Sequence, residues 1–207
     1  MSVAPQFALK PGRVYRTRDL SRWGANAPRL AKRLVREGKL TPLAHGLYAH
    51  LRKGRFGAVP LRDEELMRGF LDGSAFVFTG PDLWNSLGLG TTGLFSAPLV
   101  YNAKRSGTFD LGGRRFVLRR VAFPEKPTPE WFVVDLFENA RSAGTSPEML
   151  ADSLRRAMAR GAFDPERLRD AAGRFGSRRT QGLVERALGD RVPSTGEVGK
   201  QGRRPVR

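Results

Sequence analysis

The chain has no cysteine and only two histidines, His45 and His50. The absence of cysteine excludes disulfide bridges, thiolate metal sites and cysteine nucleophiles, and it is compatible with a reducing compartment. The first residues lack the apolar core of a signal peptide, and no run approaches the roughly 18 apolar residues that a membrane-spanning helix needs. We therefore expect a cytoplasmic protein with no membrane partner.

Acidic residues are scarce relative to basic ones, because 37 Lys and Arg face 20 Asp and Glu over 207 residues, a net charge of +17. Residues 1–56 hold 13 bases against two acids, residues 57–188 hold 19 against 16, and residues 189–207 hold five against two. A general bias of the genome towards arginine would not produce this asymmetry. A basic module that binds a polyanion would, and nucleic acid is the expected partner.

Residues 17–38 have the pattern of two short helices joined by a tight turn. Thr17 is a suitable cap for the first helix, whereas Asn26 is a suitable cap for the second, which Gly38 ends. Leu30 and Leu34 give the second helix an apolar stripe. This pattern predicts a helix-turn-helix.

The segment that follows, residues 40–51, alternates apolar and polar residues on either side of His45-Gly46. Such a pattern predicts a β-hairpin, or wing, directly after the second helix. Arg52, Lys53 and Arg55 come next and are further candidates for contacts with phosphates or with the minor groove.

Basic side chains on the second helix are spaced three and four residues apart on the side opposite the stripe. At the start of such a helix, Asn26 and Arg29 would lie nearest the base edges, where asparagine pairs with adenine and arginine with guanine. Lys32, Arg33 and Arg36 would hold phosphates. The alternative is a solvated amphipathic helix, although helices of that kind usually alternate in sign. The predicted DNA-binding residues are Thr17, Arg18, Arg22, Asn26, Arg29, Lys32, Arg33, Arg36, Lys39 and His45.

The stretch "RLVREGKLTPLAHGLY", within residues 14–50, resembles the AbiEi-type antitoxins of type IV toxin–antitoxin systems. The resemblance is looser over residues 75–140. It implies a winged-helix part that represses its own operon through double-stranded promoter DNA, with inverted repeats as the expected site. It also implies a second domain that neutralises a nucleotidyltransferase-like toxin encoded nearby.

Beyond residue 56 the patterns predict a helix at 64–71, a buried strand at 75–80, a helix at 81–89 and three strand-like runs between 98 and 123. Helices then begin after the capping residues Thr128, Ser146 and Asp164, and a last helix covers 178–188. The expected fold is α+β. It comprises a winged helix-turn-helix domain (1–56), a larger α+β domain with a small, mainly antiparallel sheet and C-terminal helices (57–188), and a basic disordered tail (189–207).

No pattern indicates catalysis, so we expect no enzyme, no cofactor and no metal site. The acidic residues Asp82 and Asp110 lack a recognisable spacing, and Asp135 with Glu138 is expected on a solvated helix face. Three alternatives to the antitoxin stay open. They are a stand-alone winged-helix regulator, a DNA-directed nuclease built on Asp82 and Asp110, and an RNA-binding protein in which Phe56, Trp84, Phe95 and Tyr101 stack on bases. These aromatic residues are more often part of a core.

Overall fold

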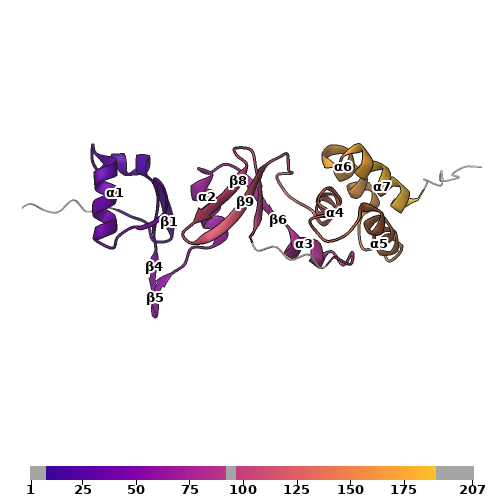
Figure 1. The fold of residues 1–207 in the computed structure, drawn as a ribbon, viewed down its shortest axis with the longest axis horizontal. Helices are drawn as coiled ribbons and strands as arrows, with labels where there is room; N and C mark the ends of the chain where they lie inside the picture. The colour runs from indigo at the N-terminus through magenta and orange to yellow at the C-terminus, as the bar shows by residue number, and fades with distance from the viewer. Residues whose placement is uncertain (1–7, 92–96, 190–207) are drawn as a thin grey trace, which may run out of the picture.

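The computed structural model describes residues 8–91 and 97–189, and its elements give an α+β fold, as the sequence predicts. Figure 1 shows the elements spread along one long axis, with the N-terminal elements at one end and the last four helices at the other. The elements, with η for a 3₁₀ helix, are β1 (Arg13–Arg16), η1 (Thr17–Trp23), α1 (Ala27–Arg36), β2 (Thr41–Ala44), β3 (Leu47–His50), β4 (Arg52–Gly54), β5 (Gly57–Val59), α2 (Asp63–Phe70), β6 (Phe76–Thr79), α3 (Pro81–Ser86), β7 (Leu99–Asn102), β8 (Gly107–Leu111), β9 (Arg114–Arg120), α4 (Pro129–Glu138), α5 (Pro147–Ala159), α6 (Pro165–Phe175) and α7 (Arg178–Leu188).

The N-terminal sheet has the strand order β1-β3-β2, and both pairings are antiparallel. The β2–β3 hairpin turns at His45-Gly46, so the predicted hairpin is confirmed. The buried side of α1 packs into a cluster with Tyr15, Leu20 and Leu40. Helix α1 ends where Gly38 takes a φ of +66°, a conformation that glycine adopts without steric cost.

The first predicted helix is a 3₁₀ helix, and Thr17 does not cap it. The element begins at Thr17 itself, and the Asp19 carboxylate accepts a hydrogen bond of 2.8 Å from the Arg16 backbone N–H. Thr17 Oγ1 instead donates to the Gly46 carbonyl oxygen at 3.4 Å. The prediction was wrong because a seven-residue segment is short enough for the tighter 3₁₀ winding that is common in short pieces.

The largest sheet has the order β6-β7-β9-β8, with a parallel β7–β9 pairing between two antiparallel ones. All four residues of β7 are buried, as expected of an inner strand. Val100, Phe116 and Leu118 belong to a buried cluster with α2, whereas Leu99 and Tyr101 belong to a cluster with α4. Both faces of this sheet are therefore covered.

The C-terminal helices start at the predicted caps. Thr128, Ser146 and Asp164 each accept hydrogen bonds from backbone N–H groups of the next turn, and Pro follows each cap. Helix α7 is capped in the same way by Ser177. The four helices share a large core that continues onto one face of the four-stranded sheet.

The three buried clusters join the two ends of the molecule. The middle cluster combines Leu47 and Ala49 of β3 with α2 and with the four-stranded sheet. Residue 56, at which the sequence places a domain boundary, lies in the turn between β4 and β5. Of the expected tail, residues 190–207 lie outside the described residues.

Candidate nucleic-acid interface

Helix α1 is built to present one polar side to solvent. The Asn26 side-chain oxygen accepts a hydrogen bond from the Arg29 backbone N–H at 3.0 Å, and Pro28 occupies the first turn. Ala27, Leu30, Ala31 and Leu34 are buried. Because this apolar side packs into the core, the polar side of α1 faces solvent in a fixed orientation.

The exposed side of α1 carries the four predicted bases Arg29, Lys32, Arg33 and Arg36. Glu37 forms an ion pair with Arg33 at 3.8 Å and a closer one with Lys39 at 2.8 Å. The hydrogen bond from Lys39 is the main cause of the lowered pKa of Glu37.

Three cations on this side have no acidic partner. None of the acidic side chains in the described part of the chain forms an ion pair with Arg29, Lys32 or Arg36. These residues are three, four and seven positions apart, so they follow one side of the helix for two turns. The result is a linear array of three cations that form no ion pair within the described chain, which attracts a polyanion.

Among the remaining predicted residues, Arg18 and Arg22 have intramolecular contacts. The Arg18 guanidinium pairs with the Asp72 carboxylate, and Arg22 Nε donates to the Asp19 carbonyl oxygen at 2.8 Å. The Arg22 guanidinium also lies 4.7 Å from the centre of the Trp23 ring. His45 is exposed in the β2–β3 turn. The structure thus brings Asn26, Arg29, Lys32 and Arg36 onto one helix and gives Thr17 and Arg18 contacts within the protein.

Asp72 holds a cluster of bases between the N-terminal sheet and the middle of the molecule. Besides Arg18, it pairs with Arg16 at 3.6 Å and with Lys104 at 3.8 Å. The hydrogen bond from Arg18 lowers the pKa of Asp72, and the charges of Arg16 and Lys104 act in the same direction. No local pattern indicates this cluster, because Asp72 and Lys104 are far in the chain from Arg16 and Arg18.

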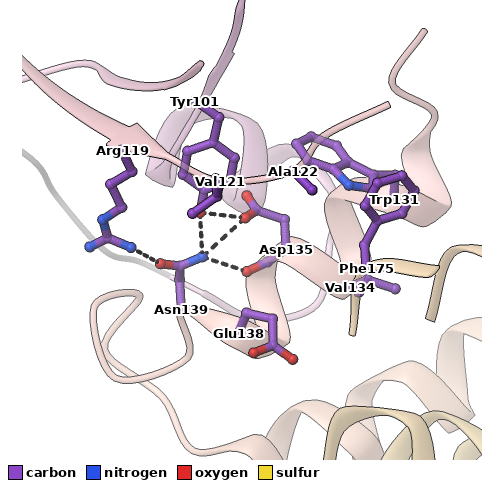
Figure 2. A pocket seen from close by; sticks show the side chains of 10 residues that line it. All are labelled: Tyr101, Arg119, Val121, Ala122, Trp131, Val134, Asp135, Glu138, Asn139 and Phe175. Atoms are coloured by element: carbon purple, nitrogen blue, oxygen red, sulfur yellow. Dashed lines mark hydrogen bonds between the residues drawn. The ribbon is translucent and has the colours of Figure 1, made fainter. Parts of the chain in front are cut away.

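A second polar site is buried under the four-stranded sheet, where Tyr101, Arg119, Trp131, Asp135 and Asn139 line a cavity of about 240 Å³. Figure 2 shows the Asn139 side chain between Arg119, Tyr101 and the carboxylate of Asp135. Arg119 Nη1 donates to Asn139 Oδ1 at 2.6 Å, and Asn139 Nδ2 donates to Asp135 Oδ1 at 3.0 Å.

Asp135 is buried, so its predicted place on a solvated helix face was wrong. Its carboxylate accepts hydrogen bonds from Tyr101 Oη at 2.7 Å, from Trp84 Nε1 at 2.8 Å and from Thr79 Oγ1. Burial raises the pKa of Asp135 despite these bonds. The whole of α4 is apolar apart from its ends and this residue, so the carboxylate is enclosed with the rest of the helix.

The structure does not bring the two acids of the nuclease alternative together. Asp82 is in α3, which follows β6, whereas Asp110 is in β8, and these strands are at opposite edges of the sheet. Asp110 forms an ion pair with Arg115 at 3.2 Å. The described residues contain no group of three or more His, Cys, Asp or Glu side chains suited to a metal ion.

The aromatic residues of the RNA-binding alternative separate into two kinds. Trp84 and Tyr101 are buried, whereas Phe56 is 96% exposed. Phe95 lies outside the described residues.

In the part of the chain that the structure covers, no helix is long and apolar enough to cross a bilayer.

These features define a mixed α+β protein with a basic helix exposed near one end. No protein-family model and no curated protein matches the sequence. The fold is similar to that of the RV2827C protein from Mycobacterium tuberculosis, known from a crystal structure. The two share 16% sequence identity with a TM-score of 0.53, over 85% of this chain and 71% of that one. At this identity the likeness concerns the fold alone.

Proposed function

We propose that the N-terminal elements form a winged helix-turn-helix and that the protein is a sequence-specific DNA-binding repressor in the cytoplasm. Helices η1 and α1 would be the two helices of the motif, with α1 in the major groove. The β2–β3 hairpin would be the wing. The protein would act as the antitoxin of a type IV toxin–antitoxin pair and would repress its own operon.

The array of Arg29, Lys32 and Arg36 carries this proposal. A solvated helix normally pairs its bases with acids at neighbouring positions, and none of these three forms an ion pair with a described acidic side chain. Arg29, next to the N-terminal end of α1, would contact a guanine, and Lys32 and Arg36 would bind phosphates. Asn26 already bonds the helix N-terminus with its oxygen, so its amide N–H₂ is the group that remains for a base.

The antitoxin part of the proposal rests on the resemblance of residues 14–50 to the AbiEi-type antitoxins. The partner would be a nucleotidyltransferase-like toxin encoded beside this gene. A stand-alone regulator would have the same DNA interface and would lack this partner.

The test of DNA binding compares the protein's own upstream duplex with a scrambled duplex of equal length at physiological salt. Tighter binding to the upstream duplex is expected. If about five phosphates are neutralised, the log–log salt dependence of the affinity should have a slope of about −4 to −5. Equal, weak binding to both duplexes would overturn the proposal.

Single variants distinguish the residue proposed to contact a base from those proposed to bind phosphates. Arg29→Ala should lower affinity for the upstream duplex about 5- to 150-fold and relax its sequence preference. Lys32→Ala and Arg36→Ala should each lower the affinity for both duplexes by the same factor and flatten the salt slope by about one unit. Arg160→Ala is the matched control, since Arg160 is an exposed arginine in the distant C-terminal part.

The antitoxin part is tested by expressing the neighbouring toxin-like gene with and without this protein. Restored growth in the presence of the wild-type protein, and also of the Arg29→Ala variant, would support neutralisation that is independent of repression. Growth arrest that this protein does not relieve would leave a stand-alone regulator.

A further inference from the structure

The hairpin β4–β5 is the most exposed part of the described chain that has regular structure. Its register pairs Arg52 with Val59, Lys53 with Ala58 and Gly54 with Gly57, and all six of these residues are exposed. Arg55 and Phe56 form the two-residue turn. Figure 1 shows the hairpin extending away from the body of the molecule beside the N-terminal sheet.

Phe56 at the tip lacks the burial that phenylalanine normally finds. Its side chain is 96% exposed, and Val59 on the same hairpin is 45% exposed. The Arg55 guanidinium lies 5.6 Å from the centre of the Phe56 ring. A two-stranded hairpin is at best marginally stable alone in water, and an exposed aromatic tip adds to its apolar surface. The exposure of Phe56 therefore favours a partner that covers the tip of the hairpin.

The charge around Phe56 indicates the chemistry of that partner. Residues 51–62 contain no acidic residue. Arg52 is held by Glu65 of α2 at 3.4 Å, but Lys53 and Arg55 form no ion pair with any described acidic side chain. Two cations without an acidic partner beside an exposed ring match a nucleic acid, which offers phosphates and the flat apolar faces of bases together.

The root of the hairpin is tied to the end of helix α1. His50 Nδ1 donates to the Lys39 carbonyl oxygen at 2.6 Å, and only Leu51 separates His50 from β4. The same sheet that supports α1 through Tyr15 therefore leads directly into the hairpin. Helix α1 and the hairpin are therefore joined through one small sheet.

We propose that the β4–β5 hairpin is a second DNA-contacting element, in which Lys53 and Arg55 bind phosphates and the Phe56 ring inserts at a base step. The inference rests on the proposed function, because it needs the duplex that α1 binds. It assigns the aromatic tip a wedge role, which unstacks neighbouring bases and fixes the position of the protein along the duplex.

The experiment uses the full chain and the upstream duplex carrying the fluorescent adenine analogue aminopurine at successive positions. Wild-type protein should raise the fluorescence at one base step, because the analogue brightens when it is unstacked. Phe56→Ala should abolish that rise, lower the affinity about 5- to 150-fold and leave the salt slope unchanged. The double variant Lys53→Gln/Arg55→Gln should flatten the slope by about two units.

Met149→Ala is the matched control, because Met149 is a 64% exposed apolar side chain on distant α5. Specific binding of the upstream duplex with equal affinity for Phe56→Ala and Met149→Ala would overturn the wedge and leave the proposed function standing. Failure of the wild-type protein to prefer the upstream duplex would overturn the proposed function itself. A Phe56-dependent preference for single-stranded RNA over the duplex would also overturn the wedge.

Discussion

Asp135 is an ionisable group placed where several buried donors need an acceptor. Trp84 Nε1, Tyr101 Oη and Asn139 Nδ2 all donate to its carboxylate, and each of these residues is itself buried. A charged group enclosed in this way is costly to desolvate, but its removal takes this acceptor away from Trp84 Nε1 and Tyr101 Oη, whereas Asn139 Nδ2 still donates to the Tyr101 hydroxyl and to the backbone carbonyl of residue 135. We therefore expect the hydrogen bonds of Asp135 to stabilise the packing of α4 against the four-stranded sheet.

Asp135→Ala should lower the free energy of unfolding by about 3–5 kcal/mol, because it leaves unsatisfied donors and a cavity. Asp135→Asn should cost less, since it leaves no cavity and its amide oxygen still accepts from Trp84 and Thr79, although its amide nitrogen then faces the Asn139 amide, a second donor. Urea denaturation measures both. A loss below about 1 kcal/mol for the alanine variant would contradict the structural role.

Asp72 predicts an acid-dependent contribution to stability. Since the Arg18 hydrogen bond lowers the pKa of the folded-state carboxyl, Asp72 stabilises the protein above its ordinary pKa and loses this effect as the pH falls through the folded value. Asp72→Asn should melt at a lower temperature than wild type at pH 7. The difference should shrink below about pH 3.9, the ordinary value for aspartate.

Asp82→Asn is the control for Asp72, because Asp82 is exposed and has no ion pair among the described residues. Asparagine also tolerates the φ of +57° at position 72. A constant difference in melting temperature between Asp72→Asn and wild type at every pH would mean that the ion pairs contribute nothing.

At the scale of elements, Asn26 combines a structural role with a proposed recognition role. Asn26→Ala should lower the free energy of unfolding by about 1 kcal/mol, because the Arg29 N–H loses its cap. Asn26→Ser should restore the stability and not the DNA sequence preference. Thermal denaturation and duplex binding, measured on the same samples, separate the two roles. Restored preference in the serine variant would remove Asn26 from base reading.

The C-terminal helices were predictable because their start signals are local. Thr128, Ser146 and Asp164 followed by proline are recognisable from the sequence, and each caps its helix. The β4–β5 hairpin was not predicted, since residues 52–59 lack the alternation of apolar and polar residues that indicates a strand. The basic side of α1 was predictable from spacing, but its division into paired and unpaired bases was not, because the partners are set by the folded positions of acids.

At the scale of the whole molecule, packing between distant segments could not be derived from local patterns. One buried cluster joins β3, α2 and the four-stranded sheet. The apolar pattern of each segment indicates that these residues are buried, but it does not indicate which other segment they pack against. Arg16 donates from β1 to the Phe70 carbonyl oxygen at the end of α2, and Asp72 adds its ion pairs beside it. This junction therefore determines how the N-terminal sheet is held against the rest of the fold.

Gly69 allows helix α2 to approach strand β1 at this junction. A Cβ atom at position 69 would lie 2.3 Å from the Val14 Cβ atom, which is far inside contact distance. Gly69→Ala should therefore push α2 away from β1 and lower the free energy of unfolding by about 1–3 kcal/mol, the usual cost of overpacking.

Gly182 in α7 is the matched helical glycine, because a Cβ atom there meets nothing within 4 Å. Gly182→Ala should raise the free energy of unfolding by about 0.5–1 kcal/mol through higher helix propensity. Urea denaturation of the two variants gives opposite signs if the contact between α2 and β1 is as close as the structure has it. Two stabilising substitutions would show that α2 and β1 do not pack against each other.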